Sequence, residues 1–309
     1  MIMFRLLVRF AIPVGGCLLA LTALMQIVAS HLPPRGDVLA FTNLSIGDEN
    51  LVYRELTLMD LNTGMTHTVA RTRERHFYHL DWSPDGRYIA YTNRNVDRHL
   101  YTIDLYTGEI TTVVDDGADP HYPSWGPTGD KITFSASHAD AQGNITTQVY
   151  VVNTDGTDMH AITDSPNSQL YPDWSTDGRH IVTIKRESDT VYNLHIITPD
   201  GTPTRQLTDI PDIYKSDPIW SPDDTRIAID GGITHPNIYV VDATTGEMTL
   251  VAERAREPSW SPDGRRLVYI HIDNNDIYIV NADGTGPHQR ITFTHLLPEH
   301  NPIWHPSDR

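Results

Sequence analysis

Cysteine is almost absent from this sequence. One cysteine, Cys17, occurs in 309 residues, so no disulfide can form within the chain. The folded part must therefore be held together by packing and hydrogen bonds. Basic residues are also scarce, because 23 Lys and Arg stand against 40 Asp and Glu and give a formal net charge of −17. Such a surface repels nucleic acid, and no long basic run offsets it, so we exclude a nucleic-acid partner.

The motifs of several enzyme classes are missing as well. The sequence contains no GxSxG elbow of a serine hydrolase, no HExxH zinc motif, no glycine-rich phosphate loop and no cysteine pair. These absences exclude the enzymes that depend on those motifs. We therefore predict no catalytic residue, no metal ligand set and no cofactor.

One long uncharged run stands near the amino terminus, at residues 10–29 ("FAIPVGGCLLALTALMQIVA"). Its length at helical rise is sufficient to cross a bilayer, and Arg5 and Arg9 before it favour a cytoplasmic amino terminus. We interpret residues 1–30 as a signal anchor and residues 31–36 as a linker stiffened by two prolines. A cleaved secretory signal and a lipoprotein signal at Cys17 are the alternatives. All three place the remaining chain on the periplasmic or extracellular side.

A tryptophan recurs every 40 to 49 residues, and none occurs elsewhere. A regular period of this size indicates an array of equivalent units. Proline stands two residues before the tryptophan in five of the six copies, and a turn such as "SPDG" follows it. We expect each tryptophan to wedge between neighbouring units as a structural residue. The six are Trp82, Trp125, Trp174, Trp220, Trp260 and Trp304.

Each unit reads as four short strands in a meander. After the turn comes a strand that is apolar on both faces, such as "YIAYT" or "RLVYI", then a variable loop, a third strand, a glycine turn and a short fourth strand. A sheet that is apolar on both faces needs cover on both sides, which a ring of such sheets supplies. The sequence therefore predicts an all-β, six-bladed propeller over residues 37–309.

The last copy, "NPIWHPSDR", stops after one strand, and the first unit, which begins at Asp37, lacks that strand. Joining the two ends completes a sixth blade with one strand from the carboxyl terminus and three from the amino-terminal side. We therefore expect Ile303 to lie beside Leu39.

This repeat grammar, "PxWSPDG" followed by "IAY" and "IYVVDxxTG", resembles the WD-repeat-like propeller of the TolB type, found in a periplasmic protein of the Tol–Pal envelope system. It is similar to the propeller half of dipeptidyl-peptidase and prolyl-oligopeptidase relatives. The resemblance covers residues 37–309 and implies a non-catalytic propeller. TolB carries an α/β domain before its propeller, whereas here a membrane segment takes that place, so membership of the Tol–Pal system does not follow.

Polar and aromatic residues precede each tryptophan by three or four positions. In a propeller of this type they lie where each innermost strand begins, at one mouth of the central channel. We expect them to form a partner-binding site there. The eight candidates are His79, His121, Tyr122, Tyr171, Asp217, Glu257, His300 and Asn301.

Two functions are consistent with these patterns. The first is a membrane-anchored, extracytoplasmic platform that binds a protein or peptide without catalysis, with a glycan as the other ligand class. The alternative is a metal-dependent glycan lyase or hydrolase that uses histidines and carboxylates at the channel mouth, since some polysaccharide lyases with similar propellers hold a metal there.

Overall fold

The structure is a computed structural model that describes residues 37–48, 51–73, 76–93, 98–115, 117–139, 145–188, 191–209, 217–232, 234–294 and 298–306. Within these ranges no helix could span a lipid bilayer. The predicted signal anchor at residues 1–30 and linker at residues 31–36 lie outside the described residues.

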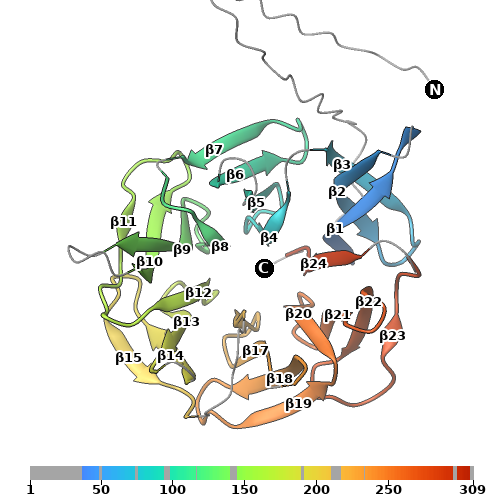
Figure 1. The fold of residues 1–309 in the computed structure, drawn as a ribbon. Helices are drawn as coiled ribbons and strands as arrows, with labels where there is room; N and C mark the ends of the chain where they lie inside the picture. Colours follow the sequence, from blue (N-terminus) through green and yellow to red (C-terminus); the bar gives the residue numbers. More distant parts are fainter. Residues whose placement is uncertain are drawn as a thin grey trace, which may run out of the picture.

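The chain forms six antiparallel sheets of four strands each, arranged as a ring (Figure 1). Blade 1 contains β24 (Glu299–Trp304), β1 (Val38–Ile46), β2 (Val52–Asp60) and β3 (Thr66–Thr72). Blade 2 contains β4 (Tyr78–Trp82), β5 (Tyr88–Asn93), β6 (His99–Asp104) and β7 (Ile110–Val114). Blade 3 contains β8 (His121–Trp125), β9 (Lys131–Ala139), β10 (Ile145–Asn153) and β11 (His160–Ala161).

The second half of the ring repeats this order. Blade 4 contains β12 (Gln169–Trp174), β13 (Ile181–Arg186), β14 (Tyr192–Ile197) and β15 (Pro203–Gln206). Blade 5 contains β16 (Ile219–Trp220), β17 (Arg226–Gly231), β18 (Asn237–Asp242) and β19 (Met248–Ala252). Blade 6 contains β20 (Ala255–Trp260), β21 (Arg266–His271), β22 (Asp276–Asn281) and β23 (Gln289–Arg290). The prediction of an all-β, six-bladed propeller is confirmed.

The ring closes through β24, the last strand of the chain. Leu39 pairs with Trp304 and Ala40 pairs with Ile303, while the His305 N–H donates to the Val38 carbonyl at 2.8 Å. The predicted closure by one carboxyl-terminal strand is therefore confirmed (Figure 1).

Each seam between blades is apolar, as the two-faced strands require. Trp82 of blade 2, for example, belongs to one buried cluster with Val38 and Ala40 of blade 1. Five of the six tryptophans are buried, and Trp174 is half-buried. Truncating a large buried side chain of this kind costs about 3–5 kcal/mol of stability.

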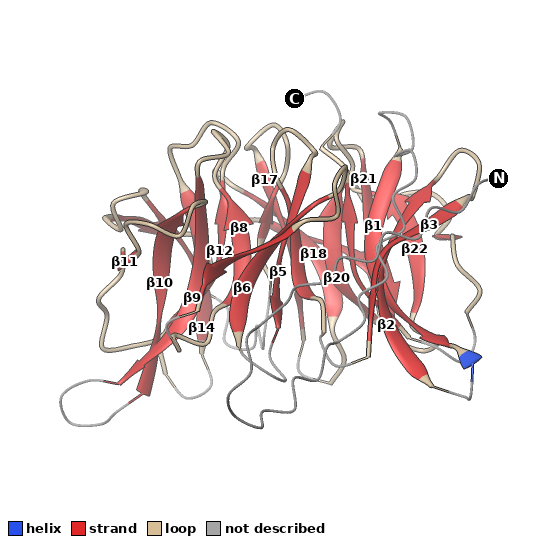
Figure 2. Ribbon diagram, turned by 90° about the horizontal axis from the view of Figure 1, so that it is seen from above, coloured by secondary structure: helices blue, strands red, loops and turns tan. Residues whose placement is uncertain are grey.

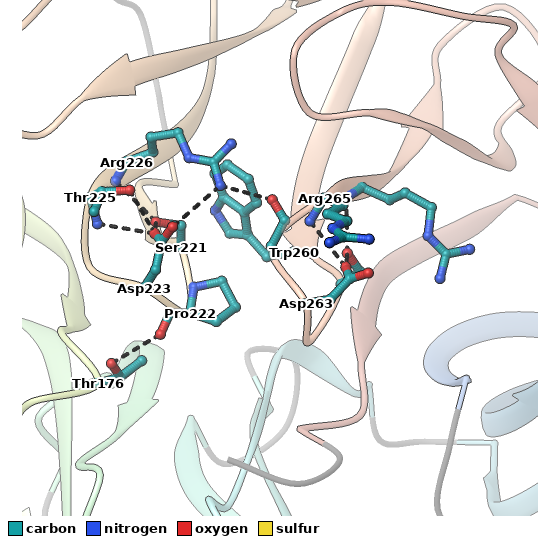
Figure 3. Close-up of polar contacts among 12 residues, drawn as sticks. Thr176, Ser221, Pro222, Asp223, Thr225, Arg226, Trp260, Asp263 and Arg265 are labelled. Atoms are coloured by element: carbon teal, nitrogen blue, oxygen red, sulfur yellow. Dashed lines mark hydrogen bonds and ion pairs between the residues drawn. The ribbon is translucent and has the colours of Figure 1, made fainter.

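In blades 2, 4, 5 and 6 the turn after the tryptophan uses its serine and aspartate to fix its own backbone. In blade 5 the Ser221 hydroxyl donates to Asp223 Oδ1 at 2.6 Å and accepts the Arg226 N–H at 3.0 Å (Figure 3). The Arg226 guanidinium then reaches the next blade, where it lies 4.8 Å from the Trp260 ring centroid and donates to the Gly264 carbonyl at 2.8 Å. Such a cation–π contact adds about 0.5–1 kcal/mol. The turn is thus also a clamp between two blades.

The fourth turn position shows why one departure from the repeat is tolerated. Gly86 and Gly264 have φ of 67° and 65°, the left-handed conformation that favours glycine, and Asp224 takes the same place with φ of 55°. The strain is offset because the Asp224 carboxylate accepts hydrogen bonds from the Thr176 N–H, the Thr176 hydroxyl and the Asp177 N–H of blade 4. Asp224 stands where other copies of the repeat have glycine, and its side chain links blades 4 and 5, which a glycine could not do.

We call the face that carries these turns the turn face and the opposite face the loop face. In Figure 2 the turns between the first and second strands gather at the upper edge. Asp37 lies on the turn face too, because it directly precedes β1 where β1 pairs with the end of β24. The innermost strands begin at the loop face, where the predicted partner-binding residues stand.

Candidate functional site

Six side chains, one from each blade, meet at one end of a central cavity of about 170 Å³, which runs past the six tryptophans to the turns that follow them, where Pro84, Pro127, Thr176 and Pro306 line it. Each stands three residues before its tryptophan, and all six are half-buried. We call this set the inner ring. It consists of His79, Tyr122, Tyr171, Asp217, Glu257 and Asn301.

A β-bulge positions the inner ring. The pairing of the innermost strand with the second strand shifts register at this point, as between His121 and Ser124 in blade 3. Five inner-ring residues have a left-handed φ between 50° and 56°, and these are His79, Tyr122, Tyr171, Glu257 and Asn301. A bulge re-aims a side chain and releases a backbone N–H from the ladder. Non-glycine residues held in this conformation concentrate at functional sites.

The released N–H groups bond across the seams between blades. The Tyr171 N–H donates to the Ser135 hydroxyl of blade 3 at 2.9 Å, and the Glu257 N–H donates to Asp230 Oδ2 of blade 5 at 2.9 Å. The Asn301 N–H donates to Glu257 Oε2 at 2.6 Å. These bonds offset the cost of the bulge and fix neighbouring inner-ring residues relative to one another.

A second set of inter-blade bonds lies one layer deeper. In four blades the residue directly before the tryptophan is polar and accepts the backbone N–H of the next blade's tryptophan. The pairs are Asp81 with Trp125 at 2.6 Å, Ser124 with Trp174 at 3.2 Å, Asp173 with Trp220 at 2.7 Å, and Ser259 with Trp304 at 3.2 Å.

In the other two blades the residue directly before the tryptophan is isoleucine, and its backbone carbonyl accepts a hydrogen bond from a tryptophan indole instead. The Trp260 indole N–H donates to the Ile219 carbonyl at 3.0 Å, and the Trp82 indole N–H donates to the Ile303 carbonyl at 3.4 Å. The other four indole N–H groups are buried and find no acceptor among the described residues. Each seam thus fixes its tryptophan through either the backbone or the indole, and the tryptophans form the rigid wall of the cavity.

The inner ring is aromatic on one side. The His79 and Tyr122 rings lie 3.7 Å apart between centroids, and the Tyr122 and Tyr171 rings meet edge-on at 4.2 Å. His79 Nδ1 is 3.1 Å from the Thr92 hydroxyl. Burial and the nearby Asp217 raise the pKa of Tyr122 well above its usual range and that of Tyr171 to about 12, so both phenols remain neutral.

The other side of the inner ring is acidic. Burial and the charges of Asp230 and Glu257 raise the pKa of Asp217 well above its usual range. Burial likewise raises the pKa of Asp230 to about 6, against the backbone hydrogen bonds that it accepts from Glu257 and Asp217. Burial pushes the pKa of Glu257 upward, but the His300 hydrogen bond and the Arg256 charge outweigh it and lower the pKa. The Arg256 guanidinium thus acts on Glu257 and Asp230, while Asp217 has no cation beside it among the described residues.

Six of the eight predicted partner-binding residues line the cavity, whereas His121 and His300 are not among its lining residues. Both stand four residues before their tryptophan rather than three. His300 lies behind Glu257, with Nδ1 at 3.7 Å from Glu257 Oε1. Sequence reasoning missed Asp230 and Arg256, which lie outside the tryptophan motif. It also passed over Asp81 and Asp173, although both directly precede a tryptophan.

Among the residues that the structure describes, no three His, Cys, Asp or Glu side chains are arranged to hold a metal ion. The inner ring instead places the phenol rings of Tyr122 and Tyr171 next to the carboxyl group of Asp217, which acts on the pKa of both.

A family model described as the TolB beta propeller domain matches residues 20–209, which is more than half of the chain. This chain belongs to the TolB beta propeller domain family. The predicted resemblance is thus confirmed at the level of the family.

Curated relatives of this TolB-type propeller are longer proteins. It is 28% identical over 240 residues to the Tol-Pal system protein TolB of Francisella tularensis subsp. mediasiatica, a match that covers 74% of this chain and 54% of that protein. It is 25% identical over 206 residues to the uncharacterized peptidase YuxL of Bacillus subtilis, covering 53% of this chain and 31% of that protein. The chain thus spans about a third to a half of the length of these two relatives.

Solved structures share the fold at low identity. TolB from Acinetobacter baumannii superposes with a TM-score of 0.70 at 20% identity, covering 88% of this chain and 67% of that one. The propeller in a nidogen/laminin complex also gives 0.70, at 13% identity, covering 89% and 100%. An oligogalacturonate lyase in complex with manganese gives 0.57 at 14% identity, covering 86% of each chain. At these identities the likeness shows the fold alone.

Proposed function

We propose that this TolB-type propeller is a non-catalytic platform that binds a protein or peptide partner at its loop face, on the periplasmic or extracellular side of a membrane. The observation that carries this proposal is the inner ring. Six unlike side chains converge from six blades on one half-buried cavity, held by bulges whose strain the seam hydrogen bonds offset. Non-glycine residues held in the left-handed region cluster at ligand-binding sites, and five of the six inner-ring residues are of this kind.

Exposed apolar side chains at the loop face support a macromolecular partner. Ile46 and Val52 pair at the end of the β1–β2 hairpin and are 59% and 47% exposed, and Ile145 at the start of β10 is 74% exposed. The strands of these two hairpins are 9 residues long and extend at the lower edge of Figure 2. Apolar side chains on projecting hairpins are suited to protein contacts. The loops between the second and third strands of blades 1, 2 and 3, which we expect to add contacts, have tips outside the described residues.

The predicted anchor gives the platform an orientation. A membrane segment at residues 1–30 followed by a short linker reaches Asp37, which lies on the turn face. The turn face then lies nearest the bilayer, and the loop face with its inner ring points away from it. Carbonate extraction of the full-length chain tests the anchor: we expect the protein to stay in the membrane pellet, and release into the supernatant would contradict anchoring.

The binding function is tested by affinity capture from native membranes after crosslinking. We compare the wild-type chain, a Tyr122→Ala/Tyr171→Ala double variant of the inner ring, and an Arg265→Ala control on the turn face. The proposal expects the same captured protein with wild type and control and its loss with the double variant, while thermal melting shows that all three are folded. Equal capture by all three would contradict the assignment to the inner ring. Stoichiometric metal together with cleavage of a glycan would replace it with the lyase alternative.

A further inference from the structure

The inner ring has two chemically different halves that face one cavity. Tyr122 and Tyr171 line it on one side, and the carboxyl groups of Asp217 and Glu257 line it on the other. A volume of about 170 Å³ corresponds to about six water molecules at roughly 30 Å³ each, which is about the volume of one long side chain. The cavity is therefore suited to one inserted side chain rather than to a folded surface.

The carboxyl groups differ in what they already bind. Glu257 Oε1 is paired with the Arg256 guanidinium, and Glu257 Oε2 accepts the Asn301 N–H. Asp230 accepts the backbone N–H groups of Glu257 and Asp217. The carboxylate of Asp217, in contrast, accepts no hydrogen bond from the described residues, and its pKa is raised by burial first and then by the charges of Asp230 and Glu257. It is the acceptor that remains available to a ligand.

The local charges do not balance. Asp217, Asp230 and Glu257 carry up to three negative charges, and Arg256 supplies one positive charge that also serves Asn275 through a 3.2 Å hydrogen bond. His300 adds a second positive charge only when it is protonated. A cation placed at Asp217 would compensate this excess, and the faces of the two phenol rings would attract it as well.

We propose that the cavity receives a protonated lysine side chain from an extended peptide segment of the partner, with the ammonium group at Asp217 and the methylene chain against Tyr122 and Tyr171. This inference rests on the proposed function and names the chemistry of its partner. An ammonium group has three donors for carboxylate and phenol oxygens, and its apolar stem matches the aromatic wall. A fully apolar side chain would leave Asp217 buried without compensation.

Proton linkage gives the binding event a second readout. In the free protein, burial and the neighbouring carboxyl groups raise the pKa of Asp217, so the group is protonated in mildly acidic solution. A lysine ammonium at 3 to 4 Å favours the ionised carboxylate and displaces that proton. The carboxyl groups that interact with Asp217 and titrate with it are Asp230 and Glu257, while the phenols of Tyr122 and Tyr171, which also lie near it, remain neutral. Binding should therefore release a proton and tighten as the pH rises.

The experiment uses the full-length chain in detergent and two blocked pentapeptides of sequence Gly-Ala-X-Ala-Gly, where X is lysine or its uncharged analogue norleucine. All six tryptophans line the cavity, so intrinsic fluorescence reports its occupancy. We expect the lysine peptide to bind at least about tenfold more tightly than the norleucine peptide, the size of one charge-assisted hydrogen bond. Calorimetry in two buffers of different ionisation enthalpy should show release of one proton.

Two variants assign the effect to the site. Asp217→Asn, which keeps the shape, should lower the affinity for the lysine peptide about tenfold and abolish the proton release. Glu247→Gln removes one negative charge from an exposed turn of blade 5 and should change neither. If Asp217→Asn fails to fold, Tyr122→Leu replaces it with an expected loss of about fivefold.

Equal binding of the two peptides, no saturable binding at millimolar concentration, or an unchanged affinity in Asp217→Asn would overturn the lysine assignment. These outcomes are separate from the capture experiment. Loss of partner capture in the Tyr122→Ala/Tyr171→Ala variant together with equal peptide binding would leave the platform standing and remove only the lysine. Selective lysine binding without any captured protein would support the lysine site and contradict the proposed binding platform.

Discussion

Asp173 joins three consecutive innermost strands, so its removal should weaken the ring as a whole. Its Oδ1 accepts the Ser124 hydroxyl of β8 at 3.0 Å, and its Oδ2 accepts the Trp220 N–H of β16 at 2.7 Å. Both donors are buried, with Ser124 3% and Trp220 5% exposed. A hydrogen bond to a charged group contributes about 1.5–3 kcal/mol, and a buried donor left without an acceptor adds to the loss.

We expect Asp173→Ala to lower the free energy of unfolding by about 3 kcal/mol. Two such hydrogen bonds at full strength would contribute up to about 6 kcal/mol, but the carboxylate is half-exposed and both bonds end on the same group, so their contributions do not add in full. With a urea dependence of about 3 kcal/mol per molar, the midpoint falls by about 1 M. Asp173→Asn keeps an acceptor oxygen for the Trp220 N–H and turns its NH2 group toward Ser124 Oγ, which can accept it, so both contacts become neutral hydrogen bonds and the change should cost about 1 kcal/mol.

The measurement is urea unfolding followed by tryptophan fluorescence and far-ultraviolet circular dichroism, whose transitions must coincide for a two-state reading. Glu247→Gln, an exposed change in the same charge, serves as the control and should lie within about 0.5 kcal/mol of wild type. If Asp173→Ala is no less stable than that control, the inter-blade bonds contribute nothing and the reasoning about the seams is refuted.

Three further outcomes follow from the seams and the buried acid. Trp304→Ala should cost about 3–5 kcal/mol and expose the closing strand, measured as a lower urea midpoint and faster amide exchange in β1. Asp224→Gly relieves a left-handed aspartate but loses three hydrogen bonds to blade 4, so a net loss of about 1–2 kcal/mol is expected, and a gain in melting temperature would contradict it. Burial of Glu299 raises its pKa from 4.5 to about 7. Its contribution to stability is therefore fully present below pH 4.5 and is lost as the pH rises through 7. At pH 8 Glu299→Gln should be more stable than wild type by up to about 3 kcal/mol and should have the higher urea midpoint, whereas at pH 4 it should show no advantage.

The repeat made the architecture predictable from the sequence. The period of the tryptophans, the two-faced strands and the half-unit at each end are local features, and together they leave a closed ring of six blades as the consistent solution. The inner ring was only partly predictable, since a one-residue offset changes the face to which a strand residue points. His121 and His300 stand one position before the inner ring, and the bulge that separates them from Tyr122 and Asn301 has no separate mark in the sequence.

The partners of the inner ring could not be predicted, because they come from other elements. Asp230 ends the second strand of blade 5, and its role depends on the Glu257 N–H that the bulge of blade 6 releases. Arg256 faces Glu257 only because the register shifts between Arg256 and Ser259. These contacts depend on backbone geometry across a seam, and residue type and spacing alone do not specify them.

Closure by β24 has a consequence for how the chain matures. Thr42 and His300, which bond across the closing pair, are 258 positions apart in sequence. Until the last residues emerge, the inner edge of β1 offers unpaired backbone groups, and such an edge pairs readily with any available strand, including the β24 of a second molecule. We therefore expect a chain clipped within β24 to form domain-swapped dimers or aggregates rather than a slightly weakened monomer.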